Sequence, residues 1–145
     1  DKGEYQLTNA LENMKNKGLK FTTGEVTEWL DCGNKDATVH TCERVLDHNK
    51  NTEMIADDSQ MINSKIIEPC YIGSGTKIEN SIIGPNVSIG NNTIILNSQI
   101  KESIIQNTSK IENAKLYKSM IGNNVFFDGH NIELEVSIGD FSEVK

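Results

Sequence analysis

The feature that most constrains this chain is a repeat of 16 or 17 residues that runs from Ile55 to the end. Each repeat starts with an isoleucine, which a small residue follows in all but one case. These pairs are Ile55-Ala56, Ile72-Gly73, Ile89-Gly90, Ile105-Gln106, Ile121-Gly122 and Ile138-Gly139. A fixed period of this length predicts a solenoid, in which each repeat forms one coil and buries its apolar residues only against neighbouring coils.

Two further apolar rows keep the same period, so each coil has three sides with one inward residue on each. The first row is Met61, Ile78, Ile95, Ile111 and Phe127, and the second is Ile66, Ile83, Ile100, Leu116 and Ile132. A further row, mostly apolar and with Cys70 at an inward position, follows four residues after the second: Cys70, Val87, Ile104, Met120 and Val136. The pattern predicts a mainly β chain that forms a parallel β-helix of about five coils over residues 51–145.

A row of corner residues supports the same architecture. It consists of Asn63, Asn80, Asn97 and Asn113, and Gly129 continues it. Asparagine and glycine tolerate a positive φ, so we predict one turn that recurs on every coil.

Residues 1–50 do not follow the period. Four apolar residues with helical spacing, Leu7, Ala10, Leu11 and Met14, predict a helix that ends at Gly18. The β-rich segments 20–23 and 25–30 predict two short strands or one bent strand. A second helix is predicted from Asn34 or Asp36 to about His48, with inward residues Val39, Val45 and Leu46.

Charge, cysteine content and hydropathy indicate which partners and which cellular compartment to expect. The formal net charge is −7 and the acidic and basic residues are interleaved, which disfavours nucleic acid and anionic membranes as partners. The three cysteines form no CxxC motif, which indicates a reducing compartment. Because we find neither a signal-peptide pattern nor an apolar run of roughly 18 residues, we expect a soluble cytoplasmic protein.

Two short motifs flank the predicted strands, Glu4-Tyr5-Gln6-Leu7-Thr8 and Trp29-Leu30-Asp31-Cys32-Gly33. Together with the order helix, strand, helix and β-helix, they resemble the C-terminal third of bacterial sugar nucleotidyltransferases. The closest resemblance is to glucose-1-phosphate thymidylyltransferase-like enzymes that end in a hexapeptide-repeat domain. It implies that residues 1–50 are the end of a catalytic domain and that residues 51–145 form a left-handed β-helix.

The resemblance also implies a chemistry. Members join a nucleoside triphosphate to a sugar 1-phosphate and release pyrophosphate, with Mg²⁺ held by two separated aspartates. Asp31 matches the second of these aspartates. The alternative is that Asp31 simply ends a strand. Glu4 matches a glutamate near the sugar pocket. The Gly-rich nucleotide loop and the first aspartate have no counterpart here. We therefore expect that this chain alone binds no cofactor and is inactive, and that Mg²⁺, nucleotide and sugar phosphate bind only the full-length parent.

A second functional hypothesis concerns His130. Many hexapeptide-repeat proteins are acyltransferases in which a histidine deprotonates the acceptor. His130 falls in register with Ser64, Ser81, Ser98 and Ala114, so it is either catalytic towards a sugar or sugar nucleotide or part of a loosened last coil. No long loop interrupts the coils to build an acyl-CoA cleft, which favours the second interpretation.

Self-association is expected under either hypothesis. Exposed isoleucines interrupt the polar sides of the predicted prism, at Ile82, Ile94 and Ile104. The N-terminal piece would also expose apolar residues that faced a catalytic domain. We therefore predict a homo-oligomer formed through the β-helix or through this piece.

Overall fold

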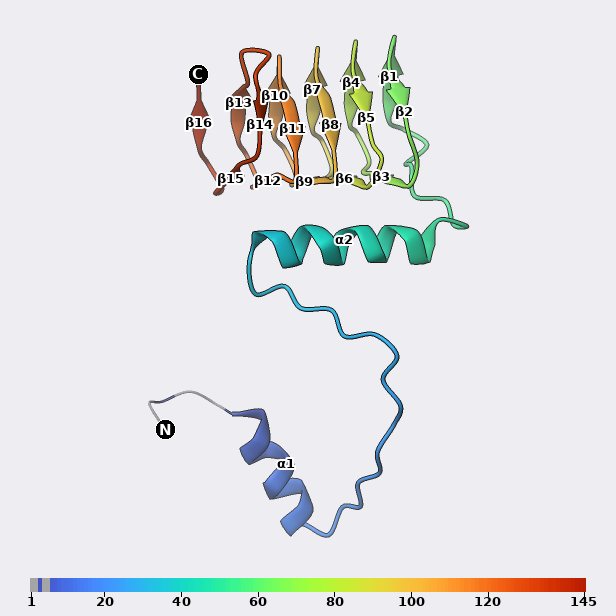
Figure 1. Ribbon diagram of the computed structural model, residues 1–145, viewed down its shortest axis with the longest axis vertical. Coiled ribbons are helices and arrows are strands. Elements are labelled where there is room, and N and C mark those ends of the chain that lie inside the picture. The colour runs from blue at the N-terminus through green and yellow to red at the C-terminus, as the bar shows by residue number, and fades with distance from the viewer. Residues whose placement is uncertain (1–2, 4–5) are drawn as a thin grey trace.

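The computed structural model describes residue 3 and residues 6–145 of the chain, and Glu4 lies outside these described residues. It contains helix α1 (Leu7–Asn16), helix α2 (Lys35–Asn49) and sixteen short strands. In Figure 1 the strands stack along one axis, α2 lies beside the stack, and α1 lies apart from it. No helix among the described residues is long and apolar enough to cross a membrane.

The strands form three parallel sheets, which are the three faces of a solenoid. Face A contains β3 (Cys70–Ile72), β6 (Val87–Ile89), β9 (Ser103–Ile105), β12 (Met120–Ile121) and β15 (Ser137–Ile138). Face B contains β1 (Gln60–Ile62), β4 (Lys77–Glu79), β7 (Ile94–Leu96), β10 (Lys110–Glu112), β13 (Phe126–Asp128) and β16 (Glu143–Val144). Face C contains β2 (Lys65–Ile66), β5 (Ile82–Ile83), β8 (Gln99–Lys101), β11 (Lys115–Tyr117) and β14 (Glu133–Leu134). The predicted parallel β-helix of about five coils is confirmed, and its left hand stays a prediction from the resemblance.

The predicted apolar rows form the core. On face B, Ile78 pairs with Ile95, Ile95 with Ile111, and Ile111 with Phe127, and these side chains are at most 1% exposed. The next coil approaches Gly73 so closely that a side chain there would clash with it. A Cβ on Gly73 would lie 2.4 Å from Asn91 Oδ1 and 2.8 Å from the Asn91 nitrogen.

The corner asparagines adopt the predicted left-handed turn. Their φ angles run from 47° at Asn63 to 50° at Asn113. Their side chains form a ladder, in which Asn63 Nδ2 donates to Asn80 Oδ1 at 2.7 Å and the last asparagine, Asn113, donates to Asp128 at 3.3 Å. Because the amides bond to one another, each turn is held in register with the next.

The last coil departs from the prediction. Two residues separate β10 from β11, whereas four (residues 129–132) separate β13 from β14. The longer turn shifts the inward position, so Leu116 pairs with Leu134, and Ile132 is 60% exposed. Placing Ile132 in the core row was therefore wrong. Gly129 packs against Ala114 without a positive φ, and the left-handed residues are His130 and Asn131.

The inward row of face A also differs. Val87 pairs with Ser103, not with Ile104, because only one residue separates β8 from β9 at that corner. The inward positions of the next two coils are Ser103 and Ser119, and both are buried. Ile104 and Met120, which the sequence row placed in register with Val87, lie instead in the adjacent outward row.

Residues 6–33 contain α1 but no strand, so the two predicted strands are absent from this described segment. A strand needs a neighbouring edge to satisfy its backbone, and no strand of the solenoid pairs with these residues. The apolar side chains here are exposed, and Trp29 is 83% exposed. The predicted end of the first helix is confirmed to within two residues, because Gly18 follows α1 with a φ of +84°.

Helix α2 begins where the sequence predicts. The Asn34 side chain caps it by accepting a hydrogen bond from the Ala37 nitrogen at 2.9 Å. The helix packs on face A against β6 and β9 and buries Val39 and Leu46. Val45, which we predicted to point inward, is 49% exposed because it lies on the other side of the helix.

Candidate functional site

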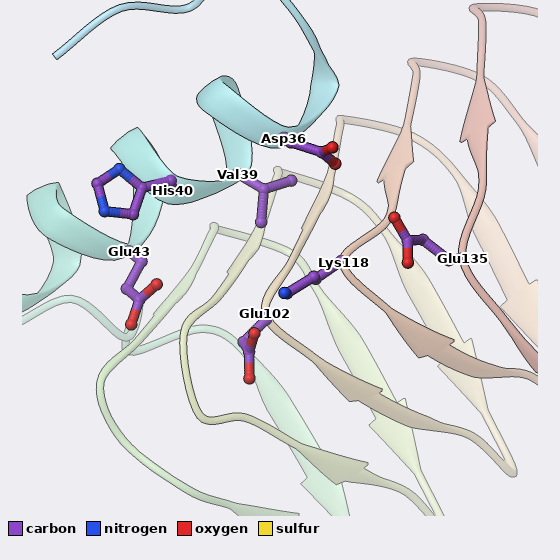
Figure 2. A pocket seen from close by; sticks show the side chains of 7 residues that line it. All are labelled: Asp36, Val39, His40, Glu43, Glu102, Lys118 and Glu135. Carbon is purple, nitrogen blue, oxygen red and sulfur yellow. The ribbon is translucent and has the colours of Figure 1, made fainter.

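One pocket lies between α2 and the corner that joins face C to face A. It has a volume of about 410 Å³. Figure 2 shows its lining, with Asp36, Val39, His40 and Glu43 from the helix and Glu102, Lys118 and Glu135 from the corner. The pocket therefore depends on the docking of α2.

The corner residues of the pocket occupy equivalent positions on successive coils. Glu102 follows β8, Lys118 follows β11 and Glu135 follows β14, and the first two have φ angles of 47° and 46°. The repeat therefore stacks a glutamate, a lysine and a glutamate along one edge of the solenoid. This is a mixed-charge edge, with the lysine between the two acids.

Polar contacts fix α2 along this edge. Lys35 Nζ donates to the Lys118 carbonyl oxygen at 2.9 Å and also pairs with Asp36 and with Glu135. The hydrogen bond to Glu135, followed by the one to Asp36, raises the pKa of Lys35. Further along the helix, Asn86 Nδ2 donates to Glu43 Oε1 at 3.1 Å. Glu135 and Glu43 therefore help to hold the helix on the coils.

The pocket has the groups of a polar binding surface. It contains four carboxylates, one lysine and His40, and Val39 is its apolar contact. The thiol of Cys42, on the same helix, is half-buried, and burial raises the pKa of this thiol. A thiol with a raised pKa is a poor nucleophile at neutral pH. We did not predict this pocket from the sequence, although the 16- and 17-residue spacing of Glu102, Lys118 and Glu135 indicates its corner.

Asp31 lies outside this pocket, in the exposed segment just before the cap of α2. Its carbonyl oxygen accepts a hydrogen bond from Thr41 Oγ1 at 3.0 Å, so the backbone at Asp31 is tied to the helix. Along residues 3 and 6–145, no group of three or more carboxylate, histidine or cysteine side chains could hold a metal ion. Mg²⁺ in proteins is often held by one or two carboxylates together with water and substrate phosphates, so Asp31 as a Mg²⁺ ligand of the parent enzyme stays a prediction.

His130 is in the long turn between β13 and β14, and its side chain is 64% exposed. The backbone nitrogen of His130 donates a hydrogen bond to Asp128 Oδ1 at 3.0 Å. This bond is the main cause of the lowered pKa of Asp128. Its Nδ1 lies 3.9 Å from the same carboxylate oxygen. The imidazole is not in the lining of the pocket beside α2.

The predicted register of His130 is wrong. Ser64, Ser81 and Ser98 form a chain in which each hydroxyl accepts a hydrogen bond from the backbone nitrogen one coil further on, ending at the Ala114 nitrogen. The buried residue against Ala114 in the next coil is Gly129. His130 is displaced to the surface because the turn is two residues longer.

The chain was compared with curated proteins. It is 24% identical over 140 residues to a glucose-1-phosphate thymidylyltransferase of Streptomyces griseus, and 28% identical over 140 residues to the one of Streptomyces antibioticus. Each match covers 86% of this chain and 39% of the relative. By sequence, the chain resembles these thymidylyltransferases. The resemblance to sugar nucleotidyltransferases that its motifs predicted is confirmed.

A second kind of relative matches over nearly the whole chain. The bifunctional protein GlmU of Clostridioides difficile is 31% identical over an aligned length of 163 residues. The alignment covers 99% of this chain and 34% of GlmU. No protein-family model matches the chain. The chain thus spans between a third and two fifths of the length of these three relatives.

Proposed function

We propose that this chain is the C-terminal scaffold and assembly part of a sugar-1-phosphate nucleotidyltransferase. The parent enzyme would convert a nucleoside triphosphate and a sugar 1-phosphate into a nucleotide sugar and pyrophosphate. The observation that carries the proposal is the thymidylyltransferase match, which covers 86% of this chain but 39% of the relative. The core of the coils fits a scaffold role, because buried apolar side chains from successive coils pack together in its interior.

The chemistry of such a transfer needs more residues than the described part of this chain provides. Phosphoryl-transfer enzymes act mainly by positioning substrates and by neutralising phosphate charge with cations and Mg²⁺. Asp31 is a lone exposed carboxylate, and Glu4 is the second residue that the resemblance assigns to the substrate site. In this proposal the nucleotide, the sugar phosphate and Mg²⁺ bind the parent through residues outside this chain, and the chain alone is inactive.

The exposed N-terminal segment supports the same proposal. Residues 6–33 present several large apolar side chains to solvent, among them Leu7, Phe21 and Trp29. Apolar surface of this kind marks an interaction site in a folded protein. We assign it to contact with the rest of the parent enzyme, in the cytoplasm, where nucleotide sugars are made and where the three free thiols stay reduced.

A pyrophosphate-release assay tests the proposal. The chain is incubated with Mg²⁺, glucose 1-phosphate and each of the common nucleoside triphosphates, and we expect no release above the protein-free control. Turnover by the chain alone would contradict the assignment as an inactive scaffold. The coding sequence of the parent gives the complementary test, because the proposal requires a Gly-rich loop with Arg and Lys upstream.

One observation favours a second candidate function, acyl transfer to a sugar or sugar nucleotide. The imidazole of His130 is exposed and lies beside the Asp128 carboxylate, an arrangement in which the acid could orient a general base. Acyl transfer from acyl-CoA is measured for the wild type and for His130→Ala. Activity that His130→Ala abolishes would establish this function, and we expect none.

A further inference from the structure

The asparagine ladder of the solenoid contains the same dipeptide on three successive coils. These dipeptides are Asn63-Ser64, Asn80-Ser81 and Asn97-Ser98. The three asparagines are exposed, and their φ angles are 47°, 48° and 49°. The sites therefore match in sequence, exposure and backbone conformation, and they differ in their place along the stack.

An asparagine that precedes a small residue can lose its side-chain amide without an enzyme. The backbone nitrogen of the next residue gives up its proton and attacks the side-chain carbonyl carbon, and Nδ2 leaves as ammonia. The new C–N bond closes a succinimide ring, which a water molecule opens to aspartate or to isoaspartate. The reaction needs a backbone N–H that is free to lose its proton and to turn towards the asparagine side chain.

At two of the three sites, the coil before holds this N–H. The Ser81 nitrogen donates to Ser64 Oγ at 3.1 Å, and the Ser98 nitrogen donates to Ser81 Oγ at 3.0 Å. Ser81 and Ser98 are 3% and 2% exposed. A buried N–H that leaves its acceptor loses that hydrogen bond with no water to replace it. Attack at Asn80 or Asn97 therefore requires the coils to separate first.

The first site has no such protection. Asn63 lies between β1 and β2, which are the outermost strands of faces B and C (Figure 1). Among the described residues, none accepts a hydrogen bond from the Ser64 nitrogen. Outer elements also open locally at a lower free energy than central ones. The nitrogen that follows Asn63 is therefore the most available of the three.

We propose that Asn63 is a site of spontaneous deamidation, with the Ser64 nitrogen as nucleophile, and that the serine hydroxyls of the column protect Asn80 and Asn97 from the same reaction. This inference is independent of the proposed function. The products are aspartate and isoaspartate at position 63. Each event replaces a neutral amide by a carboxylate at the first corner of the solenoid.

The ladder gives this modification a structural consequence. A carboxylate only accepts hydrogen bonds, so Asp128 at the far end makes every amide of the column donate towards it. Asn63 Nδ2 accordingly donates to Asn80 Oδ1 at 2.7 Å. A carboxylate at position 63 places an acceptor at both ends of the column. However the amides between them turn, one contact then joins two acceptors, and one hydrogen bond of the ladder is lost.

Peptide mapping by mass spectrometry measures the three sites in one sample of the full chain. After incubation at mildly alkaline pH, we expect Asn63 to be deamidated about 10-fold or more faster than Asn80 or Asn97. In concentrated guanidinium chloride the three rates should agree to within about 3-fold, because the dipeptides are the same and the coils are unfolded. A folded chain in which Asn80 or Asn97 reacts as fast as Asn63 overturns the inference.

Ser81→Ala tests the protecting hydroxyl directly. The variant removes the acceptor of the Ser98 nitrogen and leaves both Asn97-Ser98 and Asn63-Ser64 unchanged in sequence. We expect deamidation of Asn97 to be about 10-fold faster and that of Asn63 to keep the wild-type rate. No rise at Asn97 overturns the protection by hydroxyls. A rise at Asn63 as large as that at Asn97 also overturns it, because the protection would then come from overall stability.

The matched control for this variant is Ser119→Ala. The Ser119 hydroxyl is also buried and accepts a hydrogen bond from the Val136 nitrogen at 3.0 Å, but Val136 follows no asparagine. We expect all three deamidation rates to change less than about 2-fold in this control. A rise at Asn97 equal to that in Ser81→Ala would overturn the inference, since loss of any buried hydroxyl would then suffice.

Asn63→Asp tests the consequence for the ladder, because it reproduces the aspartate product. We expect hydrogen exchange of the β1 and β2 amides to be about 5-fold faster than in the wild type, as loss of one hydrogen bond implies. The control Asn51→Asp makes the same charge change at an exposed residue outside the ladder and should leave this exchange unchanged. Equal exchange in the two variants would overturn the predicted loss of the hydrogen bond.

Discussion

The two helices of this chain differ in a way that their sequences do not suggest. Helix α1 has the more regular apolar stripe, with Leu7, Leu11 and Met14, yet none of its residues is buried. Helix α2 has a more polar sequence, yet it packs on face A and buries Val39 and Leu46. An apolar stripe therefore indicates that a helix has a partner, and it does not show where the partner is.

The surface that each helix meets explains the difference. Face A offers α2 an outward row formed by Ser88, Ile104 and Met120. The adjacent corner offers polar partners at Asn86 and Glu135. Residues 6–33 meet no comparable surface in the described part of the chain. In the proposed function, the surface that fits α1 is on the rest of the parent enzyme.

The largest expected contrast between these regions is in proteolysis. We expect trypsin to cut after Lys15, Lys17 or Lys20 at a rate on the order of 1,000-fold higher than after Lys77 or Lys110. The segment around α1 can be cleaved without opening any packed structure, whereas the solenoid strands must first unfold. Mass spectrometry of a digestion time course measures the sites. Early cuts within β4 or β10 would show that the solenoid is no more stable than the segment.

A core substitution gives the next largest effect. Ile95 is fully buried between Ile78 and Ile111, and we expect Ile95→Ala to destabilise the solenoid by about 3 kcal/mol through lost burial and a cavity. The matched control in α1, Met14→Ala, should change stability by less than about 0.5 kcal/mol. Thermal unfolding followed by circular dichroism measures both. A large effect of Met14→Ala would mean that α1 is packed within this chain.

Much of the solenoid could be predicted because its period is a local property of the sequence. The rows through Ile78 and Ile83 were correct wherever the turns kept a constant length. The errors fall where a turn changes length, at Ser103 and Ile104 and again at residues 129–132. The two extra residues in the turn at 129–132 move the side chain of Ile132 from the core to the surface. At Ser103 the difficulty is that a small polar residue gives no sign in the sequence that it is buried.

The candidate sites were harder to predict because they depend on contacts between distant segments. The strands predicted in residues 20–30 had the right residue types but no neighbouring edge, so their propensity was not realised. Asp31 and Glu4 were assigned from the resemblance and remain predictions.

Loss of α2 docking should be a smaller effect than loss of the core. Leu46 is a residue of α2 whose side chain is buried. We expect Leu46→Ala to weaken the docking of the helix by about 2 kcal/mol. Hydrogen exchange of the α2 amides should then be about 30-fold faster, while the strand amides stay protected. The equivalent change on the exposed helix, Leu11→Ala, should leave exchange in both helices unchanged. Equal acceleration in the strands would show that α2 and the solenoid unfold as one unit.

The ion pairs at the start of α2 should have the smallest effect. Lys35→Met removes the contacts to Glu135, Asp36 and the Lys118 carbonyl, and we expect a loss of about 0.5 kcal/mol because the partner carboxylates are exposed. The folded-state pKa of Lys35 is raised, so its contribution is full below the unfolded lysine pKa and is lost as the pH rises through the folded value. The difference in Tm between wild type and variant should therefore hold from about pH 6 to about pH 9 and vanish at strongly alkaline pH. The control Lys15→Met in α1 should have the same Tm as the wild type at every pH. A Tm difference for Lys35→Met that persisted in strong alkali would mean that the methylene stem of Lys35, not its charge, holds the helix on the coils.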